Sequence, residues 1–179
     1  HHPLIFKGLK RLDFSTYPAN LLKKMSDKNI SNIAMHTNFD KTHLGAFVAN
    51  SVLDYKVVGQ DGFIVYLEVN KPFELFAKNI ASSFGISTLK VVKSADFIKT
   101  AALITGSGGS MVDSIKADCL LSGDIKYHDA MLAKSLNISI VDIGHFESER
   151  FFPAALEPHL KNLGLEAIIS SSKNPYTYL

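Results

Sequence analysis

Short apolar runs alternate with amphipathic segments along most of the chain, and this alternation limits the fold more than any other feature of the sequence. Runs such as KTAALITG, CLLSGDI and ISIVDI are typical of buried strands, whereas residues 73–84 repeat hydrophobic side chains at helical spacing. Strands that alternate with helices favour an α/β fold with a largely parallel or mixed sheet. The segment GQDG lies between two extended runs and predicts a hairpin, and therefore at least one antiparallel pair of strands.

The other predicted elements follow from the same periodicities. Further strands are expected in the runs SNIAMH, TLKVVKSA and LEAIISS. Helices are expected in the segments ANLLKKM, THLGAFVANSVLD, SMVDSIKA and HDAMLAKSLN. A last helical stretch follows residue 150, and Pro153 and Pro158 should kink or split it because proline cannot donate a helical hydrogen bond.

Composition and charge narrow the function classes. The length of 179 residues suits one or two small domains, and Cys119 is the single cysteine, so no intrachain disulfide can form. This fits a reducing compartment, and we expect a cytoplasmic protein with Cys119 buried in a strand. The net charge of +2 and the scattered lysines do not indicate nucleic-acid binding. No apolar run reaches the length of a membrane span.

Polar clusters follow four of the predicted strands. They are HTNFD (36–40), TGSGGS (105–110), SGDIKYHD (122–129) and GHFESE (144–149). In α/β proteins functional groups gather at the carboxyl ends of strands, so these clusters are the candidate functional regions. The glycine-rich TGSGGS either cradles a phosphate or makes a tight strand-to-helix turn that lines the same cleft.

Histidines and carboxylates in these clusters could bind metal. His145 and Glu149 are four residues apart where a strand ends and a helix begins, and they would share one helix face. Asp40 also follows a strand, and the adjacent His1 and His2 precede a proline. Imidazole and carboxylate together suit Zn, Fe, Mn, Co or Ni. Spacing alone leaves alternatives open, because such histidines are commonly surface or core residues and a leading histidine pair is commonly a tag remnant.

Three blocks carry a resemblance to a known family. HHPLIFKGLK, HTNFD and SGDIKYHDAMLAKSLNISIVDIGHFESER resemble, in order, the NIF-three-like dinuclear-metal proteins, also called GTP cyclohydrolase 1 type 2 homologues. The resemblance implies that the leading histidines are native and that an N-terminal stretch of the family is absent here. It also implies two divalent metal ions, held by His1, His2, Asp40, His145 and Glu149. The chain has Ser-Gly-Asp where the family has Thr-Gly-Glu, and it lacks the Gly-Gly that often follows the aspartate.

Side chains that support the ligands are expected nearby. The candidates are His36, Thr37, Asp124, His128 and Asp129. A ligating histidine usually donates its second N–H to a carboxylate or carbonyl. We predict His128 and Asp129 as catalytic residues, with Asp129 as an acid or base. The alternative is that Asp129 only stabilises the first turn of a helix through the helix dipole.

The resemblance, and the position of the ligands at both ends of the chain, lead us to expect one of two functions and a single architecture. The first function is a metal-dependent hydrolase, similar to a cyclohydrolase, that acts on a nucleotide or phosphoester as its small-molecule substrate. The alternative is a non-enzymatic metal-binding or scaffold protein, and either would form a ring-shaped homohexamer. We expect two α/β lobes with mixed sheets and the metal site in the cleft between them. Residues 1–54 with 148–179 would form the first lobe, incomplete at its N-terminus, and residues 55–147 the second.

Overall fold

The computed structural model describes residues 1–177 of the chain. It divides into two compact units, His1–Phe39 and Asp40–Leu179. No helix among the described residues is long and apolar enough to cross a membrane. The predicted grouping of residues 1–54 with 148–179 against 55–147 stays a prediction.

Unit 1 is largely irregular and contains two helices, α1 (Ala19–Asp27) and α2 (Thr37–Phe39). The helix expected in ANLLKKM is confirmed as α1. The strand expected over residues 31–36 is wrong, because this segment forms no strand and most of it is exposed. A strand needs a hydrogen-bonded neighbour for its backbone groups, and apolar character alone does not supply one.

Unit 2 is built on one sheet. Its strands are β1 (Val57–Asp61), β2 (Ile64–Pro72), β3 (Lys90–Val92), β4 (Phe97–Ser107), β5 (Cys119–Gly123) and β6 (Ser139–Asp142). Its α-helices are α3 (Gly45–Phe47), α4 (Phe73–Phe84), α5 (Tyr127–Ser135), α6 (His145–Glu149) and α7 (Phe152–Asn162). Two π-helices, η1 (Asp40–Leu44) and η2 (Val48–Val52), and one 3₁₀ helix, η3 (Gly109–Ser114), complete the unit among the described residues.

The sheet is mixed, as predicted. Its six strands lie in the order β1-β2-β4-β5-β6-β3. The pairs β4–β5 and β5–β6 are parallel, and the remaining pairs are antiparallel, including the predicted hairpin β1–β2. The carboxyl ends of β4, β5 and β6 therefore meet at one edge of the sheet. The clusters TGSGGS, SGDIKYHD and GHFESE all begin at that edge.

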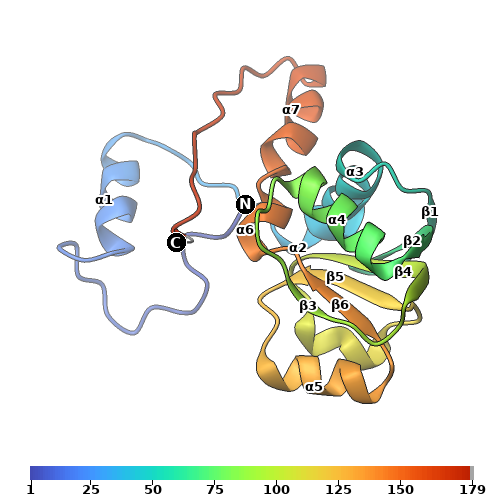
Figure 1. Ribbon diagram of the computed structural model, residues 1–179. Coiled ribbons are helices and arrows are strands. Elements are labelled where there is room, and N and C mark those ends of the chain that lie inside the picture. The colour runs from blue at the N-terminus through green and yellow to red at the C-terminus, as the bar shows by residue number, and fades with distance from the viewer. Residues whose placement is uncertain (178–179) are drawn as a thin grey trace. The chain divides into compact units, whose positions relative to one another are not determined.

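Helix α4 covers one face of the sheet (Figure 1). It begins after Pro72 and ends at Gly85, whose φ of +62° is the left-handed conformation that terminates many helices. Phe73, Phe76 and Ile80 lie on its buried side at helical spacing, and each is at most 1% exposed. Burial of each such side chain stabilises the fold by about 1.5–3 kcal/mol, so this stripe fixes α4 on the sheet.

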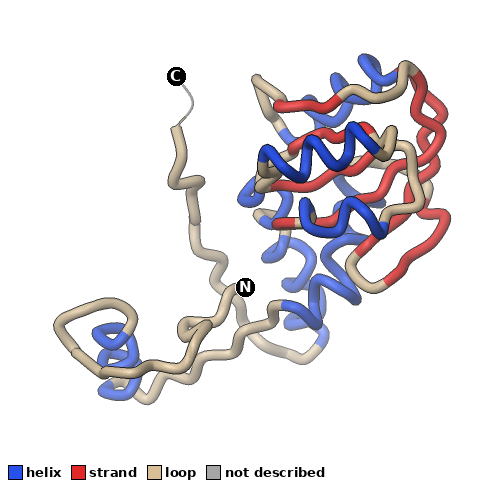
Figure 2. The backbone as a smooth tube through the Cα atoms, turned by 90° about the horizontal axis from the view of Figure 1, so that it is seen from below, coloured by secondary structure: helices blue, strands red, loops and turns tan. Residues whose placement is uncertain are grey.

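The opposite face of the sheet is covered by α5 and η3 (Figure 2). Ile104, Leu120 and Ile140 come from three neighbouring strands and pack there with Val112 of η3 and Ala133 of α5. The sheet is thus buried on both sides, which explains why its central strands read as continuous apolar runs.

The helix expected over residues 42–54 is confirmed, but its turns are not uniform. The continuous helical stretch passes through η1, α3 and η2. Gly45 lies against the sheet where an added Cβ would be 2.9 Å from Cγ2 of Val65. A glycine here allows the helical stretch to approach β2 closely, and η1 then ends against the sheet with Asp40 at its start.

Two expectations for the C-terminal region need correction. Pro158 lies inside α7 without splitting it, and the break instead falls between α6 and α7, with Pro153 in the first turn of α7. Proline in a first turn costs no helical hydrogen bond. The strand expected in LEAIISS is wrong, because residues 165–171 are irregular and exposed. Here, too, an apolar run without a paired neighbour remains irregular.

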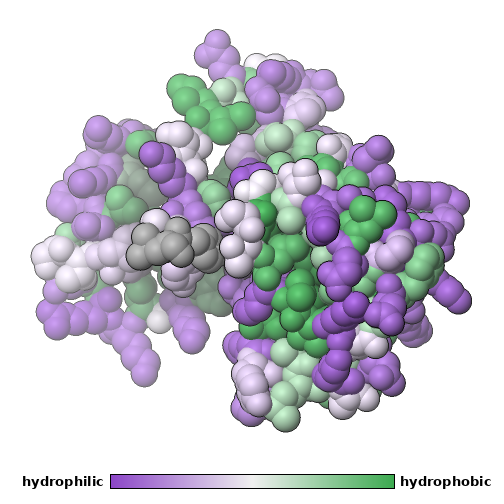
Figure 3. All heavy atoms as spheres, in the orientation of Figure 1, coloured by the Kyte–Doolittle hydropathy of each residue, from purple (hydrophilic) through white to green (hydrophobic). Residues whose placement is uncertain are grey.

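The edge strand β3 is accessible. Figure 3 shows hydrophobic side chains gathered on the viewed face of unit 2, over β3 and its surroundings. Val91 in β3 is 43% exposed and Phe97, at the start of β4, is 48% exposed. Lys90 and Lys93 flank the exposed valine, and Lys93 pairs with Glu74 at 3.0 Å and with Asp96 at 2.9 Å. A short edge bearing lysines discourages pairing with another sheet.

Candidate metal centre

Helix α6 places two potential ligands at the carboxyl edge of the sheet. The chain leaves β6, turns at Gly144 with a φ of +77°, and enters α6 directly. His145 and Glu149 lie one helical turn apart, as their spacing predicts, with His145 Nε2 3.2 Å from Glu149 Oε2. The predicted strand-to-helix junction is therefore confirmed, and the imidazole and carboxylate face each other.

Asp124 holds the other side of the imidazole. Its Oδ2 lies 2.6 Å from His145 Nδ1 and comes from the turn that follows β5. Asp124 has a φ of +55°, a left-handed conformation that short polar side chains tolerate. A carboxylate on Nδ1 fixes the ring so that Nε2 is the nitrogen available to a metal ion. The expectation that Asp124 supports a ligand thus has a matching geometry.

The two carboxylates also control the charge of the ring. Burial by itself would lower the pKa of His145, because it disfavours the charged imidazolium. The hydrogen bond that His145 donates to Asp124 and the negative charges of Glu149 and Asp124 outweigh burial, and the pKa of His145 lies above its ordinary value. The pair of carboxylates therefore attracts positive charge at Nε2, which a proton or a divalent cation can supply.

The TGSGGS loop is hydrogen-bonded to α6 and to β5 through two buried serines, Ser148 and Ser122. Ser148 is fully buried, accepts a hydrogen bond from Gly106 N at 2.8 Å and donates to His145 O at 2.9 Å. Ser122, also fully buried, accepts from Gly108 N at 2.7 Å and donates to Gly106 O. The observed role of this loop is thus a tight, anchored turn, and phosphate binding by it stays a prediction.

Gly106 is required by the space around Glu149. Its φ is +73°, and an added Cβ would overlap the Glu149 carboxylate and lie 3.6 Å from His145 Nε2. Glycine alone combines this conformation with so close an approach of backbone to carboxylate. The loop therefore defines one wall of the space in front of His145 and Glu149.

Within unit 1, three histidines form a cluster. His1, His2 and His36 have ring centroids 4.9–5.0 Å apart, and one ring nitrogen from each lies within 4.8 Å of the others. The structure thus brings together the two leading histidines and adds His36. Sequence reasoning placed His36 only among the supporting residues. The adjacent pair HH and the block HTNFD each offered an imidazole, but only their meeting in space shows three.

The remaining predicted residues have simpler surroundings. Asp40 begins the π-helix η1 and is half-buried. Thr37 Oγ1 lies 3.4 Å from His36 Nδ1. Asp129 Oδ2 accepts a hydrogen bond from Lys126 N at 3.1 Å at the start of α5, which agrees with a role in the first helical turn. His128 is exposed beside Tyr127, and catalysis by His128 and Asp129 stays a prediction.

The donor set fits divalent transition metals. Imidazole nitrogens with carboxylate oxygens suit Zn, Fe, Mn, Co or Ni. The ring of His145 also contacts the carboxylate of Asp124 through Nδ1, as histidines that bind metal typically do. The single cysteine, Cys119, lies fully buried in β5, and burial raises the pKa of its thiol. The burial of Cys119 agrees with the sequence-based prediction of a structural residue rather than a nucleophile.

Comparisons with known proteins agree with the sequence blocks. Residues 1–175 match the model of the family described as Duf34/NIF3 (NGG1p interacting factor 3). A Campylobacter jejuni protein named GTP cyclohydrolase 1 type 2 homolog is 46% identical over 179 residues, covering 99% of this chain and 74% of that protein. A Helicobacter pylori protein named GTP cyclohydrolase 1 type 2 is 46% identical over 177 residues, which cover 98% of this chain and 73% of that protein.

Solved structures share the fold. HcgD from Methanocaldococcus jannaschii, in its reduced form, has a TM-score of 0.76 and 28% identity, covering 93% of this chain and 70% of that one. The Staphylococcus aureus protein SA1388 has a TM-score of 0.79 and 24% identity, and the match covers 100% of this chain and 78% of that one. The second likeness concerns the fold alone, whereas the matched family model also covers the histidine and carboxylate blocks.

Proposed function

Because this chain belongs to the Duf34/NIF3 family, we propose that it binds two divalent metal ions and uses them to hydrolyse a nucleotide or phosphoester. The observation that carries the proposal is the arrangement of His145, whose ring is held between the carboxylates of Asp124 and Glu149. The names of the Campylobacter and Helicobacter relatives support a nucleotide as the substrate.

In this proposal each side chain has a defined task. His145 Nε2 and Glu149 would bind metal, with Asp124 orienting the imidazole. His1, His2 and His36 would supply further imidazoles. Asp40 would supply a further carboxylate. Bound divalent ions would supply Lewis-acid chemistry for the hydrolysis.

The surrounding backbone would hold the two ligands of α6 in place. The backbone at Gly106 lies directly against the Glu149 carboxylate, where an added Cβ would overlap it. Ser148 fixes the backbone of α6 and keeps His145 and Glu149 in register with each other. Such preorganised ligands lose little conformational freedom when a metal ion binds.

The proposal is tested by metal content and turnover together. The protein is purified, its metals are measured by elemental analysis, and it is reloaded separately with Zn, Mn and Fe. Nucleotides and phosphoesters are then screened for hydrolysis. We expect the unmodified protein to hydrolyse at least one of these substrates. The Glu149→Gln variant should lose this activity and part of its bound metal, and its oligomeric state should not change.

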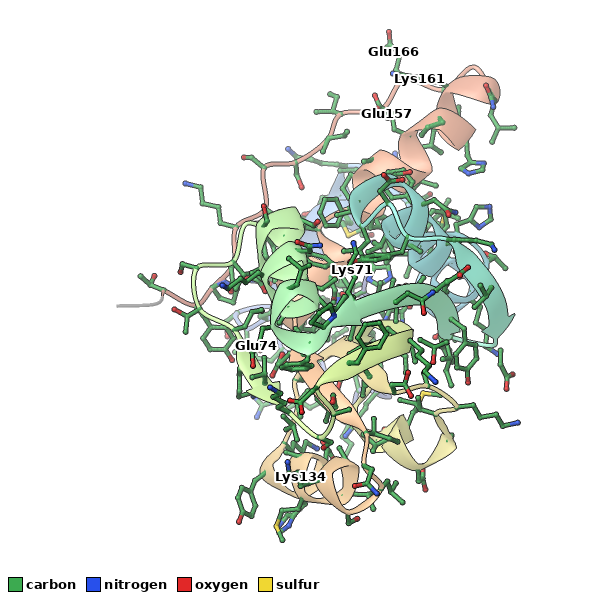
Figure 4. All side chains as sticks on the ribbon, turned by 45° about the vertical axis from the view of Figure 1, so that its right-hand side comes forward. Lys71, Glu74, Lys134, Glu157, Lys161 and Glu166 are labelled. Carbon is green, nitrogen blue, oxygen red and sulfur yellow. The ribbon has the colours of Figure 1, made fainter. Side chains whose placement is uncertain are left out.

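Glu157→Gln is the matched control. Glu157 lies on α7 and pairs with Lys161 at 2.9 Å on the surface (Figure 4). This variant removes one negative charge without approaching His145, and it should retain full metal content and activity. Equal metal content and turnover in Glu149→Gln and Glu157→Gln would refute the proposed centre.

A non-enzymatic role is the second candidate. The family description names an interacting factor, which favours a metal-binding or scaffold protein. Under either function we propose a cytoplasmic, ring-shaped homohexamer, which light scattering coupled to size-exclusion chromatography tests directly. Stoichiometric metal binding without turnover of any nucleotide or phosphoester would favour the scaffold over the hydrolase.

A further inference from the structure

A hollow of about 300 Å³ lies beside α4. Three segments line it, namely the loop after η2, the end of β2 and one side of α4. The polar residues of the lining are Asp54, Tyr55, Lys71, Asn79, Ser82 and Ser83. The volume is at the lower limit of ordinary small-molecule pockets, about 300–1,000 Å³.

Lys71 occupies a position where the strand pattern predicts an apolar side chain. Val65, Leu67 and Val69 alternate along β2 and are buried, and Lys71 is the next position of this series. The register of β2 with β4 shifts immediately before Lys71, as at a β-bulge, and Asn70 has a φ of +51°. Bulges often re-aim a side chain beside a functional site. The half-buried Lys71 thus lies beside α4 (Figure 4), where its charge needs compensation.

Within residues 1–177, the ammonium of Lys71 contacts neutral groups and pairs with no carboxylate. Its Nζ lies 3.3 Å from Tyr55 Oη and 4.8 Å from the centre of the Tyr55 ring. Asn79 Oδ1 accepts from Nζ at 3.3 Å in the amide orientation that satisfies both ends of the asparagine side chain. Glu68, on the same strand, pairs with Lys56 at 3.0 Å. The positive charge of Lys71 is therefore available to an anionic group in the hollow.

A carboxylate lines the same hollow apart from Lys71. Asp54 lies in the loop after η2, has a φ of +53° and is exposed. Among the described residues its carboxylate forms no ion pair, with Lys71 or with any other cation. Two opposite charges that share one hollow without pairing each attract a counter-charge from a ligand. A simple anion would be repelled by Asp54 and a simple cation by Lys71, so a ligand that carries both charges fits best.

The side of α4 that lines the hollow adds neutral polar groups. Asn79, Ser82 and Ser83 have the spacing i, i+3 and i+4, which places them side by side on the helix. In the described part of the chain, neither serine hydroxyl has a hydrogen-bond partner. A hydroxyl both donates and accepts, so it can bond to a carboxylate or to an ammonium.

We propose that this hollow binds the zwitterionic head of a free α-amino acid. The α-carboxylate would accept from the ammonium of Lys71, and the α-ammonium would donate to the carboxylate of Asp54. The hydroxyls of Ser82 and Ser83 would bond to either charged group. The site contains none of the predicted metal ligands, so it lies beyond the proposed hydrolysis and does not depend on it.

The test uses the full chain as purified and each proteinogenic L-amino acid in turn, with binding followed by ligand-observed NMR and calorimetry. The tightest binder is then compared with the acid that lacks its amino group and with the amine that lacks its carboxylate. Each of these analogues should bind at least about tenfold more weakly, because each loses a charge-assisted hydrogen bond.

Two variants test the assigned charges. Lys71→Met keeps an unbranched side chain without the ammonium, and Asp54→Asn keeps a residue that tolerates the φ of +53°. Each should weaken amino-acid binding about tenfold. Lys78→Met, an exposed position of α4, and Asp61→Asn, an exposed position of β1, are the matched controls and should leave the affinity unchanged. Thermal denaturation of each variant verifies that the fold is retained.

Amino acids also chelate metal ions, so binding at the candidate metal centre must be distinguished from binding in the hollow. Glu149→Gln should leave amino-acid affinity unchanged. The inference would be overturned by loss of binding in Glu149→Gln with full binding in Lys71→Met and Asp54→Asn. It would equally be overturned if no amino acid bound, or if the deaminated acid bound as tightly as its parent. Turnover of nucleotides or phosphoesters enters none of these measurements, so failure of the hydrolase would leave this site standing.

Discussion

Replacement of Asp124 by asparagine should weaken metal binding about tenfold. The Asp124–His145 contact is short, 2.6 Å, and the loss of such a supporting carboxylate typically costs about 10–100-fold in metal affinity, or about 1.4–2.7 kcal/mol. The Asp124 side chain is 54% exposed, so solvent screens its charge and the lower end of that range applies. Asparagine also tolerates the φ of +55°, so backbone strain does not confuse the result.

The assay is a competition titration of zinc against a chromophoric chelator, with Asp124→Asn and the unmodified chain side by side. Asp96→Asn is the matched control, because Asp96 is an exposed carboxylate of the same unit that pairs with Lys93. In metal-free protein, NMR should also show a lower pKa for His145 in Asp124→Asn, since Asp124 raises it. Zinc affinity equal to that of the control, with an unchanged pKa of His145, would refute the reasoning.

Three further outcomes follow from the packing. Gly106→Ala should lower both the melting temperature and the metal affinity, because a left-handed residue costs about 1–2 kcal/mol and the new Cβ overlaps Glu149; an unchanged metal affinity would contradict this. Phe76→Ala should reduce the free energy of unfolding in urea by about 3–5 kcal/mol, and a loss under 1 kcal/mol would show a looser core. Cys119 should not react with Ellman's reagent at pH 8 in the native protein and should react fully in urea, because burial raises its pKa; rapid native labelling would disprove its burial.

Elements with a strong local signal could be predicted from the sequence. The stripe of Phe73, Phe76 and Ile80, with proline before it and Gly85 after it, defines α4 almost residue by residue. The central strands were also predicted, because burial on both faces gives a continuous apolar run. The segments 31–36 and 165–171 have the same apolar character but no paired neighbour, and pairing is a property of distant residues that no local pattern contains.

The candidate site divides in the same way. His145 and Glu149 could be predicted to face each other, since one helical turn joins them. The sequence does not predict that His36 is a potential metal ligand. Its proximity to His1 and His2 depends on the path of the whole N-terminal segment. The support that Ser148 and Gly106 give to α6 was likewise hidden, since 42 residues separate the two partners of that hydrogen bond.

Because η1 is a π-helix, the direction in which the Asp40 side chain points depends on the number of residues in this turn as well as on their chemistry. A π-turn contains one residue more than an α-turn, and each residue of an α-helix rotates the chain by about 100°. Deletion of a single residue between Asp40 and Leu44 would convert the wide turn into a regular one and swing the carboxylate around the axis by that angle. An alignment gap of one position at this point would therefore mark a relative whose aspartate points elsewhere, even if every ligand type were retained.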